Sequence, residues 1–162
     1  MPIGDIAPAF DCRAIVSGDL LRLDWSQVHR GGTLVLRFDS IGDYDGSPQA
    51  LIEINDAVGS FERRGATVAM VWRDPELEIL AWAGRSPAGG GPGALKLPMI
   101  VDSGGQVASL YGMVSTEGRT LWGHVIVGPD RRLRQIAVTD SPVAANVNEL
   151  LRIVESIDED RR

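Results

Sequence analysis

Side chains able to take part in catalysis gather between residues 39 and 48 of the sequence. Asp43 and Asp45 are close enough in sequence to serve as a general acid/base pair. Ser47 could act as a nucleophile if a base lay beside it. Each group also has a structural interpretation. Carboxylates flanked by glycine often form turns by bonding their own backbone, and Ser47 before Pro48 is a typical helix N-cap.

Three further candidates lie in stretches that are otherwise apolar. Arg37 interrupts the apolar run of residues 33–38. Its cation can pair with Asp39, two residues on and on the same strand face, or it can bind a substrate. Trp122 and His124 are also two residues apart, so their side chains point to the same face of a strand. His124 is a candidate acid/base because the pKa of a histidine ordinarily lies near neutrality.

The elements that would position these residues alternate between strands and helices. Apolar runs predict strands at residues 12–16, 20–23, 33–38, 66–72, 97–102, 121–127 and 133–138. Apolar side chains at helical spacing, together with capping signals, predict helical segments at residues 25–29, 48–63, 75–82, 106–111 and 143–157. Residues 84–93 are rich in glycine and proline and predict a surface loop. This order predicts an α/β protein with a mixed sheet flanked by helices.

Composition narrows the possible functions. The 162 residues predict one domain, residues 1–157, followed by a charged tail, residues 158–162. A net charge of -6 argues against nucleic-acid and anionic-membrane partners. The start of the chain lacks signal-peptide features, so we expect a cytoplasmic protein. Cys12 is the only cysteine, and the two histidines, His29 and His124, lie far apart, so we expect neither a disulfide nor a metal site nor a cofactor.

Three motifs resemble peroxiredoxins of the alkyl hydroperoxide reductase and thiol-specific antioxidant type. Residues 3–10, Ile-Gly-Asp-Ile-Ala-Pro-Ala-Phe, are similar to that family's opening Gly-Asp-x-Ala-Pro-x-Phe. Residues 98–112 end in the family's Tyr-Gly. Residues 38–48 resemble its active-site loop, Pro-x-x-x-Thr-x-x-Cys-Pro, with Ser40 at the first Pro, Tyr44 at the Thr and Ser47 at the peroxidatic Cys. The resemblance implies a thioredoxin-like fold.

The resemblance also implies that the thiol chemistry is lost. Ser47 cannot form the thiolate and sulfenic acid that a thiol peroxidase needs. Trp122 stands where the family places an Arg beside the thiolate. If Trp122 faces the former peroxide pocket, His124 borders it too. We then expect His124 as the principal acid/base, Tyr44 as a hydrogen-bond donor, and Trp72 and Trp122 as binding walls, with Ser47, Asp43, Asp45 and Arg37 beside them.

These expectations leave three hypotheses for function. The first is an enzyme without a cofactor whose former peroxide pocket binds and transforms a small apolar or aromatic molecule by acid/base chemistry. The second is a non-catalytic binding or interaction protein on the same scaffold, with aromatic side chains filling the site. The third is an antioxidant oxidoreductase that works without a thiol. The family's habit of dimerising also predicts a homodimer, with residues 132–138 as a candidate edge.

Overall fold

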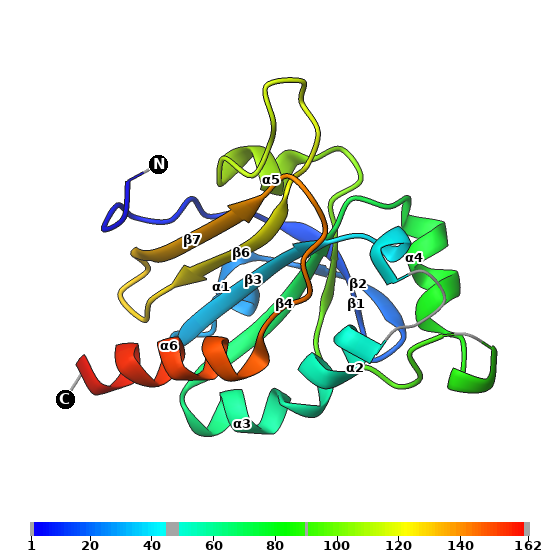
Figure 1. The fold of residues 1–162 in the computed structure, drawn as a ribbon, viewed down its shortest axis with the longest axis horizontal. Coiled ribbons are helices and arrows are strands. Elements are labelled where there is room, and N and C mark those ends of the chain that lie inside the picture. The colour runs from blue at the N-terminus through cyan, green and yellow to red at the C-terminus, as the bar shows by residue number, and fades with distance from the viewer. Residues whose placement is uncertain (1, 45–48, 90, 161–162) are drawn as a thin grey trace.

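The computed structural model describes residues 2–44, 49–89 and 91–160. Within them, seven strands form one sheet in the order β2-β1-β5-β4-β3-β6-β7 (Figure 1). Their bounds are β1 Cys12–Val16, β2 Asp19–Leu23, β3 Thr33–Asp39, β4 Ala66–Trp72, β5 Met99–Val101, β6 Trp122–Val127 and β7 Leu133–Thr139. The longer helices are α2 Gln49–Asp56, α3 Val58–Arg63, α4 Glu76–Ala83 and α6 Val147–Asp160. Shorter ones are α1 Trp25–Val28, α5 Gln106–Leu110 and the 3-10 turns Ile41–Tyr44 and Pro87–Gly89.

The centre of the sheet is parallel and its margins are antiparallel. β4 pairs in parallel with β3 and with β5, while β6 pairs antiparallel with β3, and β1 antiparallel with β5. All seven residues of β3 are buried because helices cover both of its faces. This mixed sheet confirms the predicted fold class, and the parallel strands β3, β4 and β5 end at one common edge.

Two apolar clusters cover the two faces of the sheet. Helices α2, α3, α4 and α6 pack on one face with side chains that include Leu51, Ile54, Phe61 and Val154. Helices α1 and α5 and the N-terminal segment pack on the other, around Leu36, Phe38 and Val125. Alternation along β3 separates the two clusters, since its odd-numbered residues face the first cluster and its even-numbered residues the second. Arg37 therefore lies on the face covered by α2, α3, α4 and α6.

Two predicted helices differ from the observed ones. The helix predicted over residues 48–63 is divided at Ala57 into α2 and α3. Of the apolar residues whose helical spacing predicts the buried stripe, Leu51, Ile54 and Phe61 are buried and Val58 is half-buried. The last helix begins at Val147 and not at Val143. The segment before it crosses the sheet to reach α6 (Figure 1), and Arg37 on β3 donates a hydrogen bond to the Val143 carbonyl. The helix starts after Asn146, whose side-chain oxygen accepts the Glu149 N–H at 3.1 Å and whose carbonyl accepts the Leu150 N–H at 3.0 Å, as a helix N-cap does.

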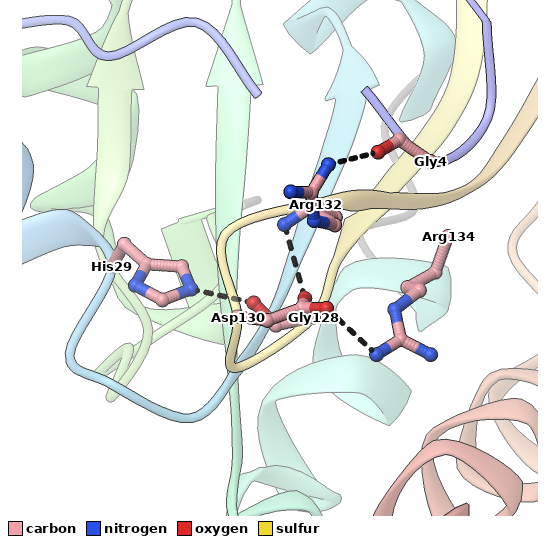
Figure 2. A network of polar contacts seen from close by, with 6 residues as sticks. All are labelled: Gly4, His29, Gly128, Asp130, Arg132 and Arg134. Carbon is pink, nitrogen blue, oxygen red and sulfur yellow. Dashed lines mark hydrogen bonds and ion pairs between the residues drawn. The ribbon is translucent and has the colours of Figure 1, made fainter. Parts of the chain in front are cut away.

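The N-terminal arm joins the sheet beside β7. The Gly4 N–H donates to the Leu133 carbonyl, and the Leu133 N–H donates to the Asp5 carbonyl, both at 2.9 Å. Arg132 also donates to the Gly4 carbonyl at 2.8 Å (Figure 2). The arm thus covers the beginning of the outer edge of β7. Among the described residues, no strand pairs with the rest of that edge, residues 134–139.

Candidate functional site

Segments distant in sequence meet where β3 and β4 end. Asp74, just after β4, accepts a hydrogen bond from the Ile41 backbone N–H at 2.9 Å. The Ser103 hydroxyl, after β5, donates to the Asp74 carbonyl at 2.7 Å. Ligands of open α/β sheets commonly bind in the crevice at the carboxyl ends of parallel strands. This edge of the sheet is therefore a candidate binding site.

Arg73 is the central side chain at this edge. Its Cζ lies 4.5 Å from the centre of the Trp122 ring, which is cation–π geometry. Its Nη1 donates to the Thr120 carbonyl at 2.9 Å, and its Nη2 donates to the Ser40 hydroxyl at 3.3 Å. Three oriented contacts hold the guanidinium in place. The sequence analysis did not identify Arg73 as a site residue. The sequence signal that could have indicated it is its position directly after the apolar run of residues 66–72, which predicts a buried strand.

Trp122 and His124 lie on the same face of β6, as their spacing predicts. Trp122 is the residue that stands where the resemblance expects an Arg. In the structure the guanidinium of Arg73, which follows β4, lies over the Trp122 ring. A positive charge is thus present beside Trp122, although it comes from the end of a different strand.

His124 lies directly opposite Arg37 in the β3–β6 register, so the two side chains share a face. Its Nε2 is 2.7 Å from the Gln135 amide oxygen on β7. In the tautomer that donates to this oxygen, Nε2 carries the proton and Nδ1 holds the lone pair. Burial lowers the pKa of His124; the Gln135 bond raises it, and the charge of Arg37 lowers it further. The ring is therefore neutral at pH 7 and suited to accept a proton.

Arg37 forms the ion pair with Asp39 that the two-residue spacing predicts. Its Nε lies 3.3 Å from Asp39 Oδ2, and both side chains are almost completely buried. The Val143 carbonyl accepts a second bond from the guanidinium. These contacts give Arg37 a structural role in holding the crossing segment. Its contact with a substrate stays a prediction.

Trp72 lies in the core. Its side chain is 0% exposed, and its ring centre is 5.3 Å from that of Trp82 on α4. It shares the face of Trp122 and His124 but packs in the apolar cluster beneath α4. The structure therefore gives Trp72 a packing role, and the binding wall that the sequence predicts at Trp72 stays a prediction.

Four predicted site residues fall outside this geometry. Asp45 and Ser47 lie outside the described residues, as does Pro48, so the predicted helix cap is untested. Asp43 and Tyr44 contribute their backbone to the 3-10 turn Ile41–Tyr44, and their side chains lie outside the description. Their assigned roles stay predictions.

Cys12, the only cysteine, lies on β1, separated from β3 by β5 and β4. Burial raises the pKa of its thiol to about 11, with further contributions from the negative charges of Asp11 and Asp102. A thiol reacts as a nucleophile only after deprotonation. Cys12 is therefore an unreactive thiol at neutral pH.

Neither a metal site nor a membrane span appears in the part of the chain that the structure describes. No three side chains of His, Cys, Asp or Glu gather there as metal ligands would. No described helix is long and apolar enough to cross a bilayer. At this edge a fixed guanidinium lies on an indole ring, and a neutral imidazole lies two residues along the same strand face from that indole.

Comparison with known sequences identifies relatives along most of the chain. A model of the AhpC/TSA family matches residues 3–136. The chain is 31% identical to a thioredoxin peroxidase of Echinococcus granulosus over 155 residues, which cover 95% of this chain and 80% of the relative. It is 33% identical to peroxiredoxin TSA1 of Saccharomyces cerevisiae over 153 residues, or 93% and 76% of the two chains.

Solved structures share the fold at lower sequence identity. A reduced 2-Cys peroxiredoxin of Plasmodium vivax superposes with a TM-score of 0.87 at 21% identity, over 98% of this chain and 83% of that one. AhpC of Mycobacterium tuberculosis superposes with a TM-score of 0.84 at 22% identity, over 99% and 94%. These likenesses agree with the thioredoxin-like fold that the sequence motifs imply.

Proposed function

The chain belongs to the AhpC/TSA family. We propose that it is a peroxiredoxin-like protein that keeps the family's fold but does not work as a thiol peroxidase. Its site at the carboxyl ends of β3 and β4 binds a small apolar or aromatic molecule. The protein transforms that molecule by acid/base chemistry without a cofactor.

The position of Cys12 carries this proposal. A thiol peroxidase needs a thiolate at its peroxide site. The only thiol of this chain lies on β1, with a pKa raised to about 11. Ser47, which the resemblance places at the peroxidatic position, has no comparable redox chemistry. These observations support a loss of peroxidase activity on a scaffold that keeps the family's fold.

His124 supports the acid/base part of the proposal. Its pKa is lowered from the ordinary value, so the imidazole is neutral at pH 7 and Nδ1 can take a proton from a bound substrate. Arg37, opposite His124, would stabilise the anion left behind. We assign Tyr44 as a hydrogen-bond donor, Trp122 and Trp72 as walls, and Ser47, Asp43 and Asp45 as polar groups that line the site.

A peroxidase assay tests the proposal directly. Consumption of hydrogen peroxide, coupled to thioredoxin or to dithiothreitol, should equal the blank. The Cys12→Ala variant is the matched control because it removes the only thiol. Turnover that disappears in Cys12→Ala would show that this thiol is reactive and would contradict the proposal. Turnover that persists in the variant would instead support an antioxidant activity that needs no thiol.

A non-catalytic binding protein is the second candidate. The burial of Trp72 and the complete pairing of Arg37 with Asp39 favour it, because both side chains already have protein partners. Native mass spectrometry of the purified protein separates the two readings. A co-purified molecule that the protein converts to product supports an enzyme, and one that stays unchanged supports a binding protein.

We also propose a homodimer formed through the outer edge of β7. The N-terminal arm occupies the edge as far as Leu133, so the open part is residues 134–139 and not the whole of 132–138. Val138 there is 48% exposed. An open strand edge offers backbone groups for pairing with a second copy. A monomer mass by light scattering at high micromolar concentration would contradict this assembly.

A further inference from the structure

We propose that Arg73 is an anion anchor, and that the ligand of this protein is therefore a small aromatic or apolar carboxylate. The carboxylate binds the guanidinium of Arg73 at the carboxyl ends of β3 and β4, beside Trp122. This inference rests on the proposed function in one respect, because it takes the same edge of the sheet as the ligand site. It adds the charge and the chemical class of the ligand.

The first argument is that the charge of Arg73 has no carboxylate partner among the described residues. Five arginines of the described chain form ion pairs, and Arg73 is not one of them. The nearest carboxylate in sequence, Asp74, accepts the Ile41 backbone N–H instead. A half-buried guanidinium held by neutral oxygens can still attract an anion.

The second argument is the geometry of the guanidinium. An arginine carries five N–H donors. One is used by the Thr120 carbonyl and one by the Ser40 hydroxyl, which leaves three without a partner in the described part of the chain. The Trp122 ring covers a flat side of the group, and stacking of this kind leaves the in-plane N–H groups accessible. The fork that binds a carboxylate through two parallel hydrogen bonds is thus already oriented.

The third argument is the position of the anchor. Arg73 follows the parallel strand β4, and Ser40 follows its parallel neighbour β3. The carboxyl ends of such strands are where open α/β sheets bind ligands. A ligand held here by its carboxylate would carry its apolar part beside the Trp122 ring. An apolar acid satisfies both groups, whereas a neutral apolar molecule satisfies only the indole.

Two probes of nearly equal shape isolate the charge. Phenylacetate and phenylacetamide are titrated separately into the ¹⁵N-labelled protein, and binding is followed at the indole N–H signal of Trp122, assigned with a Trp122→Phe variant. We expect phenylacetate to bind about tenfold more tightly than phenylacetamide, since a charge-assisted hydrogen bond is worth more than a neutral one. Arg73→Gln should remove this difference and leave phenylacetamide binding unchanged.

Arg119→Gln is the matched control. Arg119 is exposed and precedes Thr120 by one residue, so the variant makes the same change in net charge close to the site. It should keep the preference for phenylacetate. An equal loss of preference in Arg119→Gln and Arg73→Gln would overturn the proposal, because it would reveal a diffuse electrostatic effect in place of a specific contact.

The wild-type measurement decides the proposal even if Arg73→Gln fails to fold. If phenylacetate binds no more tightly than phenylacetamide, or if neither moves the Trp122 signal, Arg73 is not an anion anchor. Binding of phenylacetamide alone would overturn the anchor while sparing the proposed small-molecule site. Conversely, binding of phenylacetate through Arg73 would support the anchor even where the protein converts no ligand and the proposed catalysis fails.

Discussion

The two ends of β6 differ in how their charged side chains are paired. At the turn into β7, Asp130 accepts the Arg132 backbone N–H at 3.1 Å and pairs with the Arg134 guanidinium at 3.2 Å (Figure 2). His29 lies 2.8 Å from the Gly128 carbonyl in the same network. At the other end, Arg73 rests on the Trp122 ring, and the oxygens that accept its hydrogen bonds among the described residues are neutral.

This difference separates a structural network from a candidate binding site. At the turn, cation and carboxylate are four residues apart in sequence and neutralise each other locally. At the opposite end, Arg73 contacts neighbours that are distant in sequence and forms no ion pair with a described carboxylate, while burial lowers the pKa of His124 and keeps its ring neutral. The Asp130–Arg134 ion pair joins residues of one hairpin and stabilises the turn. Arg73 has no such carboxylate partner among the described residues, so its guanidinium can bind an anionic ligand.

The largest expected effect comes from comparing two glycines, Gly123 near the start of β6 and Gly128 just after its end. A Cβ on Gly123 would lie 1.9 Å from the Ala137 backbone oxygen, and its φ of 141° disfavours any side chain. A Cβ on Gly128 would meet mainly the ends of the Arg134 and Asp130 side chains, which can move. Gly123→Ala should therefore cost about 4 kcal/mol of unfolding free energy, and Gly128→Ala less than about 1 kcal/mol. Urea denaturation of both variants measures the difference.

Equal losses in the two glycine variants would show that the pairing of β6 with β7 is no tighter at Gly123 than at the turn. The orientation of Trp122 and His124 would then not depend on this close approach. A loss confined to Gly123→Ala would confirm that the backbone contact with Ala137 fixes the strand that carries both side chains.

Much of the fold could be predicted from local patterns. The strands predicted at residues 121–127 and 133–138 are present as β6 and β7, and the period-two alternation of strands correctly placed Trp122 with His124 and Arg37 with Asp39. The three motifs that resemble peroxiredoxins identified the family that the comparisons show. These features depend on a few neighbouring residues, so the sequence alone carries them.

The features that sequence reasoning missed depend on distant contacts. Arg73 bonds Thr120, 47 residues away, and nothing near Arg73 in sequence indicates that meeting. Arg37 likewise bonds the Val143 carbonyl, 106 residues away. Trp72 reads equally well as a binding wall or a core residue until α4 places Trp82 against it. Such contacts require the order of strands in the sheet.

A smaller effect on unfolding free energy should distinguish the buried Arg37–Asp39 pair from the exposed Arg134–Asp130 pair at the turn. The Arg37 and Asp39 side chains are 6% and 8% exposed, whereas those of Arg134 and Asp130 are 30% and 46% exposed. Arg37→Met leaves a buried carboxylate without its cation and should cost about 3 kcal/mol of unfolding free energy. Arg134→Met should cost less than about 1 kcal/mol, because water screens that pair. Thermal or urea melts that rank the variants in the reverse order would contradict a structural role for Arg37.

The smallest effect concerns the protonation of His124. It tests whether the surroundings of His124 on β6 disfavour the charged imidazolium. The pKa of His124 in the folded protein lies below the ordinary 6.5. The unfolded chain therefore takes up this proton more readily than the folded one, and the contribution of His124 to stability is lost as pH falls from 6.5 through the folded-state pKa. Gln135→Leu removes a hydrogen bond that raises the pKa and should lower it further, whereas Arg37→Met removes a repelling cation and should raise it. An NMR titration of the His124 ring in the two variants measures both shifts. If they move in the same direction, the neutral imidazole is not set by these neighbours, and His124 loses its physical basis as the proton acceptor of the site.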